Sequence, residues 1–123
     1  MKFLEIQKEI IEKYGVTIDE HSLCWGRMHV HVRERRVCKW HPKNGVKATF
    51  DLLHEVGHIE TTKSGMRRCE EEYYATKWAL DKAKEYGIDI PEKIKGRYQK
   101  YINMELDRGK RRHGANYADN LTL

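Results

Sequence analysis

The amino-acid sequence predicts an α+β fold, because stretches with the period of a helix flank one stretch with the period of a strand. Apolar residues recur at intervals of three and four in residues 3–14 and again through most of residues 46–106. Between them, residues 23–41 alternate between apolar and polar side chains. The length of 123 residues suits a single domain, since domains most often have roughly 100–150 residues.

The first half of the chain predicts one helix and one β-hairpin. A helix is expected over residues 3–14, and Gly15 is well placed to end it. In residues 23–41 the alternation predicts a hairpin or small antiparallel sheet, with the charged residues 33–36 as the turn. The apolar face of its first strand comprises Met28, Val30 and Val32, and His29, His31 and Arg33 lie on the other.

The second half predicts three helices. The first covers residues 46–60 and the second residues 68–86, with a polar loop at 61–66 between them and Gly87 at the end. The third starts at Pro91, a residue tolerated in the first turn, and its apolar stripe runs to Leu106. We expect one domain over residues 1–114 and a flexible tail over residues 115–123. The three large aromatics expected in the core are Trp25, Trp40 and Trp78.

Composition limits the classes of protein that the chain can represent. No stretch approaches the roughly 18 apolar residues that a membrane-spanning helix needs, and Glu5 and Glu9 interrupt the run that a signal peptide would require. The three cysteines are an odd and sparse set, which favours reduced thiols in the cytoplasm over a secreted disulfide framework. A net charge of +5 permits an acidic or nucleic-acid partner without establishing one.

The segment His54-Glu55-Val56-Gly57-His58 carries the clearest chemistry. Two histidines four residues apart lie on one face of a helix, so both imidazoles can reach one metal ion. Zn²⁺ lowers the pKa of a coordinated water to about 7, and Glu55 is placed to act as its general base. Gly57 is costly inside a helix, which suggests that a backbone or a ligand approaches closely there.

A catalytic zinc site needs a third protein ligand, and the next helix begins with three glutamates. Glu72 shares a stripe with Ala75 and Ala79, and small alanines would let the two helices pack closely. We therefore expect Glu72 to complete the site, with Glu71 as the alternative. Acidic residues also favour a helix N-terminus without any metal, and this explains the cluster but not its pairing with the histidines.

The two segments together resemble a known family. His54-Glu55-Val56-Gly57-His58 followed by Glu72-Tyr73-Tyr74-Ala75 looks like the gluzincin arrangement, and Trp78-Ala79 is similar to the ImmA/IrrE family of small metallopeptidases of phages and mobile elements. The resemblance covers about residues 45–80. It implies a minimal zincin-like domain with one Zn²⁺ held by His54, His58 and Glu72 and with Glu55 as general base. It also implies a protein substrate, such as a transcriptional repressor.

Several other residues are candidates for supporting roles. A second, structural zinc could be held by His21, Cys24, Cys38 and His41, whose paired spacings suit zinc. In the simpler interpretation, the two cysteines are small buried residues facing each other across strands. The strand at Val37 to His41 is the expected edge for pairing with an extended substrate. The candidates for stabilising an oxyanion are Tyr73, Tyr74, His29, His31 and His41.

The sequence thus predicts zinc-dependent hydrolysis of peptide bonds in a specific cytoplasmic protein. The alternative is a non-catalytic zinc-containing module of a phage or mobile element, in which the basic residues 108–113 contact nucleic acid or a regulator. The default interpretation of that basic segment is compensation of a helix dipole. Glu55 discriminates between the two functions, because a structural zinc site has no use for it.

Overall fold

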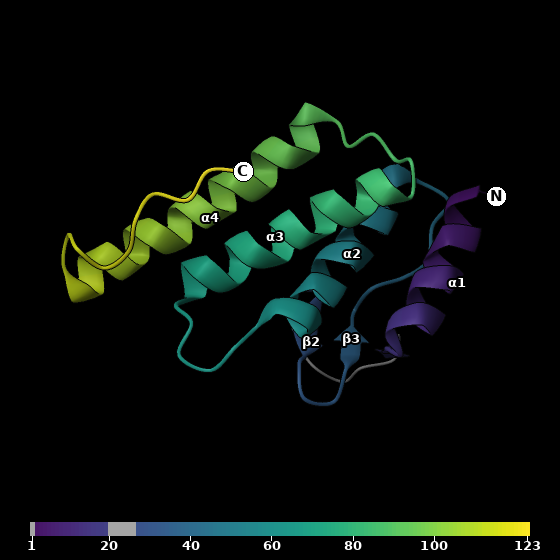
Figure 1. The fold of residues 1–123 in the computed structure, drawn as a ribbon, viewed down its shortest axis with the longest axis horizontal. Coiled ribbons are helices and arrows are strands. Elements are labelled where there is room, and N and C mark those ends of the chain that lie inside the picture. The colour runs from purple at the N-terminus through teal and green to yellow at the C-terminus, as the bar shows by residue number, and fades with distance from the viewer. Residues whose placement is uncertain (1, 20–26) are drawn as a thin grey trace.

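Four helices and three short strands make up the described part of the chain, which in this computed structural model comprises residues 2–19 and 27–123. The elements follow one another in the order α1 (Lys2–Tyr14), β1 (Thr17–Asp19), β2 (His29–His31), β3 (Arg36–Cys38), α2 (Val46–Thr61), α3 (Arg68–Glu85) and α4 (Glu92–His113). Helix α3 runs alongside α2 and α4, and α1 lies at the opposite side of α2 near the strands (Figure 1). The predicted α+β class is confirmed.

Helix α1 is fastened to the start of α2 by one buried side chain. Gln7 donates hydrogen bonds to the Lys43 carbonyl oxygen at 2.7 Å and to Thr49 Oγ1 at 2.9 Å. On the same face Ile6 and Ile10 are buried in the core. Gly15 ends the helix with a φ of +59°, in the left-handed region that a glycine adopts without strain. These contacts fix the beginning of α2, on which the candidate site lies.

The sheet is mixed, and this corrects the expected antiparallel arrangement. Its strand order is β1-β3-β2, with β1 parallel and β2 antiparallel to β3. The expected hairpin is present as β2 and β3, which are shorter than residues 23–41. Strand β1 was not predicted, because three residues are too few for a period of two to be recognised. Residues 20–26 of the expected hairpin lie outside the described residues.

Helix α2 supplies more of the buried apolar core than any other element among the described residues. Phe50, Leu52, Leu53 and Val56 are fully buried, and Val37 of β3 joins the same apolar cluster. On its other side α2 packs against the fully buried Ala75 and Ala79 of α3. The helix is therefore covered on both sides, and its polar residues are held in a fixed environment.

The tryptophans occupy different environments. Trp40 is almost fully buried and donates a hydrogen bond from Nε1 to the Ala48 carbonyl oxygen at 2.8 Å. Trp78 is half-buried and packs against the apolar core. Trp25 lies outside the described residues. Within the described ranges, no helix is both long and apolar enough to cross a membrane.

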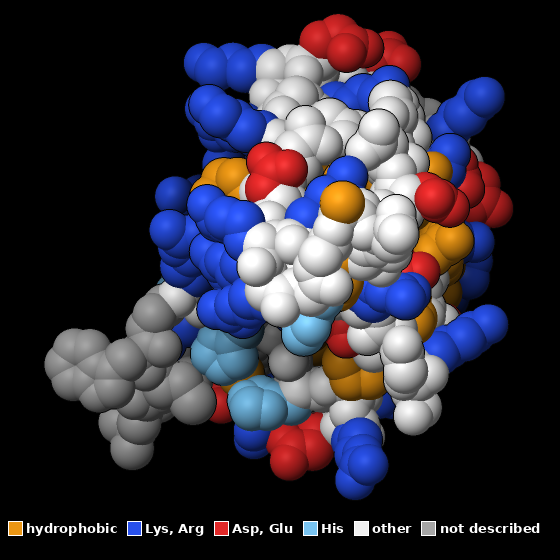
Figure 2. All heavy atoms as spheres, turned by 90° about the vertical axis from the view of Figure 1, so that its left-hand side faces the viewer, with side chains coloured by type: hydrophobic (Ala, Val, Ile, Leu, Met, Phe, Trp, Pro, Cys, Tyr) orange, Lys and Arg blue, Asp and Glu red, His pale blue; other side chains and the backbone are white. Residues whose placement is uncertain are grey.

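The C-terminal residues contact helix α4. Helix α4 continues past the apolar stripe to His113, so the basic residues form its last turn instead of following it. After Gly114 the chain returns along α4 (Figure 1). There the Tyr117 ring stacks on His113, and the Gln99 side chain bonds the Leu121 carbonyl oxygen at 2.8 Å. Lys and Arg side chains outnumber acidic ones on the face toward which α4 ends (Figure 2).

Candidate metal centre

Helix α2 presents two histidines to one point in space. His54 and His58 are one helical turn apart, and their ring centroids lie 4.7 Å from each other. Both residues are buried, although they are polar. The apolar residues that share this helix bury it deeply enough to carry the imidazoles out of bulk solvent. A buried polar group needs a partner, and the partner comes from α3.

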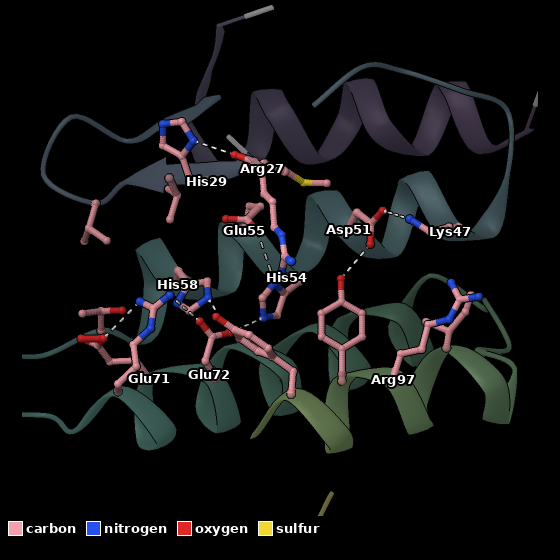
Figure 3. A pocket seen from close by; sticks show the side chains of 18 residues that line it. Arg27, His29, Lys47, Asp51, His54, Glu55, His58, Glu71, Glu72 and Arg97 are labelled. Carbon is pink, nitrogen blue, oxygen red and sulfur yellow. Dashed lines mark hydrogen bonds and ion pairs between the residues drawn. The ribbon is translucent and has the colours of Figure 1, made fainter. Parts of the chain in front are cut away.

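Glu72 of α3 provides a carboxylate to both histidines. Its Oε2 atom lies 3.1 Å from His54 Nε2 and 3.2 Å from His58 Nε2, and only 2% of the residue is exposed. The other carboxylate oxygen, Oε1, forms an ion pair with Arg68 Nη2 at 3.1 Å. The structure thus brings together His54, His58 and Glu72 (Figure 3).

Glu71 has a different environment. It is half-buried, and its nearest charged partner is Arg68, whose Nη1 lies 3.7 Å from Oε2. Glu71 lines the same pocket as Glu72, but it is Glu72 whose carboxylate lies within hydrogen-bond distance of both imidazoles. The difference follows from the helix rotation, since successive residues are about 100° apart around the axis.

Glu55 lies on the pocket side of α2 and is buried. Its Oε1 atom lies 3.4 Å from His54 Nδ1 (Figure 3). A proton held on Nδ1 by Glu55 leaves the Nε2 lone pair of His54 directed to the point shared with Glu72. The carboxylate is therefore beside the three converging donors, but its own oxygens are not among them.

The charges of the metal-free site depend on one another. Burial alone lowers the pKa of His54, but the hydrogen bonds with Glu55 and Glu72 outweigh it and raise that pKa to about 9. Burial alone raises the pKa of Glu72, but the hydrogen bonds from His54 and His58 hold it well below its usual range. Glu72 is consequently a carboxylate, the form in which it can bind a cation.

The donor set fits a Zn²⁺ ion. The ligand atoms of His54, His58 and Glu72 all lie within 4.8 Å of one another. Two imidazoles and one carboxylate are the ligands of one class of catalytic zinc sites, in which a fourth position stays open. The geometry agrees with that chemistry, because all three donors converge on one point at the edge of a pocket.

The pocket in front of these donors has a volume of about 670 Å³. Strand β2 forms one wall and α4 the opposite one, and the labelled residues Arg27, Lys47 and Arg97 extend around it (Figure 3). The strand expected to align a substrate was Val37 to His41, and this is wrong: β3 is the central strand of the sheet, paired on both sides. Among the described residues β2 is an edge strand, and it lines the pocket.

Two tyrosines of α4 complete the pocket, although the sequence predicted them only as part of an apolar stripe. The Tyr98 ring lies 4.6 Å from the His54 ring, and its hydroxyl donates a hydrogen bond to Asp51 Oδ1 at 2.7 Å. Burial and the neighbouring Asp51 charge raise the pKa of Tyr98, so the hydroxyl keeps its proton. Tyr101 lines the pocket one turn later. The sequence feature that could have indicated these pocket residues is the pair of tyrosine hydroxyls within an otherwise apolar stripe.

The residues expected to stabilise an oxyanion lie mostly elsewhere. Of the five, only His29 lines the pocket, and its ring points away from His54 (Figure 3). Tyr74 is exposed on α3, and His41 is exposed in the loop before α2. Tyr98 and Tyr101 are the tyrosines that the pocket offers instead.

The expected second zinc set is only partly described. His21 and Cys24 lie outside the described residues. Cys38 is fully buried, and its metal-binding neighbours within the described ranges are His29 and His31.

We compared the chain with known protein families, curated proteins and solved structures. The chain matches no protein-family model, and neither the curated proteins nor the solved structures compared with it include a match.

Proposed function

We propose that the chain is a zinc-dependent metallopeptidase that cleaves a specific cytoplasmic protein, with a transcriptional repressor as the first candidate. One observation carries the proposal: His54, His58 and Glu72 converge within 4.8 Å of one another beside the buried Glu55, at the edge of an open pocket. An ion held only for structure would normally have its coordination completed by protein. Here three donors and a nearby base face a space large enough for a peptide segment.

The chemistry divides between the ion and the chain. Zn²⁺ bound by these residues would supply Lewis-acid chemistry, which acidifies water and polarises a carbonyl group. Glu55 accepts a proton from the attacking water and then passes it to the nitrogen of the departing amine. Arg68 holds the second oxygen of Glu72 and so keeps that carboxylate oriented toward the histidines.

The edge strand supports a protein as the substrate. The outer edge of β2 offers backbone donors and acceptors along one wall of the pocket, to which an extended chain can add as a further strand. The cleaved bond would then lie between β2 and the tyrosines of α4, where hydroxyl donors can contact a developing oxyanion. Tyr101 is the better placed of the two, since the Tyr98 hydroxyl already bonds Asp51.

Glu55 also separates this function from that of a non-catalytic zinc module. A carboxylate that is only 7% exposed is costly to bury, and it makes no ligand contact at the convergence point. In a structural zinc site this carboxylate would only orient His54 through Nδ1. Beside an open coordination position it can also transfer a proton. The basic last turn of α4 is explained by the helix dipole and supports no second function by itself.

The test replaces the base and leaves the ligands unchanged. Glu55→Gln should keep its zinc and its fold, and should cleave a repressor substrate or a proteome-derived peptide library about 100-fold more slowly or worse, the usual contribution of a general base. Glu71→Gln is the matched control, since it removes a neighbouring carboxylate that lines the same pocket. Full cleavage by Glu55→Gln would exclude Glu55 as the base.

A further inference from the structure

Strands β2 and β3 carry a second set of metal-binding side chains. These side chains lie on the face of the sheet opposite to the one that Val30 and Val37 turn toward the apolar core. His29 pairs directly with Cys38, so the two side chains project from the same face. His31 lies two residues along β2 and therefore shares that face. Val30 and Val37, the pair between them, contact the apolar core on the other face.

The donor atoms of this cluster are close enough to share one ion. One ligand atom from each of His29, His31 and Cys38 lies within 4.8 Å of the other two. In a tetrahedral zinc site with Zn–N bonds of about 2.0 Å and Zn–S bonds of about 2.3 Å, donors are roughly 3–4 Å apart. Small rotations of side chains therefore suffice to bring them to bonding distance.

The imidazoles of His29 and His31 each have a ring nitrogen that could bind a metal ion. His29 Nδ1 lies 2.9 Å from the Arg27 carbonyl oxygen and can donate only as N–H, which leaves the Nε2 lone pair available. This is the outer hydrogen bond that commonly orients a metal-binding histidine. His31 Nε2 is buried and has no hydrogen-bond partner within residues 2–19 and 27–123. A buried nitrogen left in this state is unfavourable, and an ion would satisfy it.

We propose a second zinc site formed by His29, His31 and Cys38, separate from the centre on α2 and α3. A thiolate with two imidazoles is a donor set that zinc binds well, and water can take the fourth position. Its place on the sheet suggests a structural role, because an ion there would clamp the edge strand β2 to β3. Since β2 is also a wall of the pocket, the clamp would hold the strand along which a substrate is aligned.

This set shares Cys38 with the zinc site expected from the sequence but replaces its other members. His41 is exposed in the loop before α2 and is not among the residues that converge on Cys38. His29 and His31 are joined to Cys38 by the strand pairing itself. Sequence spacing favoured histidines three residues from a cysteine, whereas the sheet brings together residues seven and nine positions apart.

Cobalt substitution tests the site without reference to catalysis. Protein purified under reducing conditions is stripped of metal and titrated with Co²⁺, which gives an intense near-ultraviolet charge-transfer band only when a thiolate binds it. The centre formed by His54, His58 and Glu72 contains no sulfur. The band therefore cannot come from the centre on α2 and α3, whether or not the protein is a peptidase, and cysteine and histidine variants assign it to a site.

Three variants decide the outcome. Cys38→Ser and His31→Ala should each lose the band and one equivalent of bound zinc, whereas Cys69→Ser, which alters a buried cysteine on α3, should keep both. Should Cys38→Ser fail to fold by circular dichroism, His31→Ala alters a half-buried strand position and gives the same readout. Absence of the band in the parent protein, or its persistence in a folded Cys38→Ser or His31→Ala variant, would overturn the proposal.

Discussion

A Cβ atom added to Gly57 would lie 2.5 Å from the carbonyl oxygen of Ala75, so helices α2 and α3 touch backbone to backbone at this point. His54 lies about one turn before Gly57 and His58 follows it directly, while Glu72 precedes Ala75 by about one turn. The contact therefore sets the distance between the histidines and the carboxylate. Absence of a side chain at Gly57 is what permits the three donors to converge.

Gly57→Ala tests this spacing. The methyl group would force the two helices apart, and we expect the free energy of unfolding to fall by about 1–3 kcal/mol, the usual cost of overpacking. Zinc affinity should fall as well, by about 10-fold or more, as it does when the support of a ligand is disturbed. Urea denaturation and competition with a chelating dye measure the two effects.

Gly96→Ala is the matched control. Gly96 lies in α4, and a Cβ added there meets no heavy atom within 4 Å. Alanine is a better helix former, so this variant should be unchanged or more stable by up to about 1 kcal/mol. Equal behaviour of the two variants would show that the contact between Gly57 and Ala75 does not set the helix spacing.

The two neighbouring glutamates should differ sharply in zinc binding. Glu72→Ala should weaken binding by more than about 100-fold, because loss of an outer contact alone costs about 10–100-fold. Glu71→Ala should change stability by less than about 1 kcal/mol, through the helix terminus only. Affinities measured by competition for both variants make the comparison. If Glu71→Ala is instead the metal-deficient variant, the assignment of the third ligand is wrong.

The metal-free protein should lose stability as the pH rises. His54 has its pKa raised to about 9 from 6.5, so its contribution is complete below 6.5 and is lost as the pH passes through 9. The shift predicts a fall in unfolding free energy of at least about 1 kcal/mol over that interval, since one pKa unit corresponds to about 1.4 kcal/mol. Glu72 acts in the opposite direction, with a lowered pKa whose contribution is lost in acid. Chemical denaturation of protein stripped of metal by a chelator, measured from acidic pH to above pH 9, follows both losses of stability, and His54→Ala should remove the alkaline one.

Tyr98→Phe should affect stability more than metal binding. The substitution removes the hydrogen bond to Asp51, which costs about 1 kcal/mol for a typical bond. The aromatic ring remains against His54, so the zinc content should not change. Thermal denaturation and metal analysis of the variant provide the two values. A loss of zinc would indicate that the hydroxyl, and not only the ring, supports the site.

The helices could be predicted closely because each buries a stripe with a clear period. The expected 46–60 and 68–86 differ by one residue from α2 and α3 at their C-terminal ends. Strand β1 could not be predicted from the sequence, because its three residues are defined as a strand only by their parallel pairing with β3. The end of α4 was missed because its last residues are basic and solvated, and continue a helix without continuing its apolar stripe.

Part of the candidate site could also be predicted from the helical period. Residues on one helix face, His54 and His58, follow from spacing alone, and the small residues beside Glu72 indicate which face of α3 packs inward. Tyr98 and Tyr101 could not be assigned, because their place in the pocket depends on how α4 crosses the other helices. Cys38 was assigned different neighbours, because strand register is not visible in the spacing of residues.

The most direct test of the metal centre on α2 and α3 is the zinc content of His54→Ala/His58→Ala compared with that of the parent protein. Both are purified without chelators, and folding is verified by circular dichroism. We expect one equivalent less zinc in the double variant, whatever the parent holds at its second site. Equal zinc contents in the two folded proteins would contradict it.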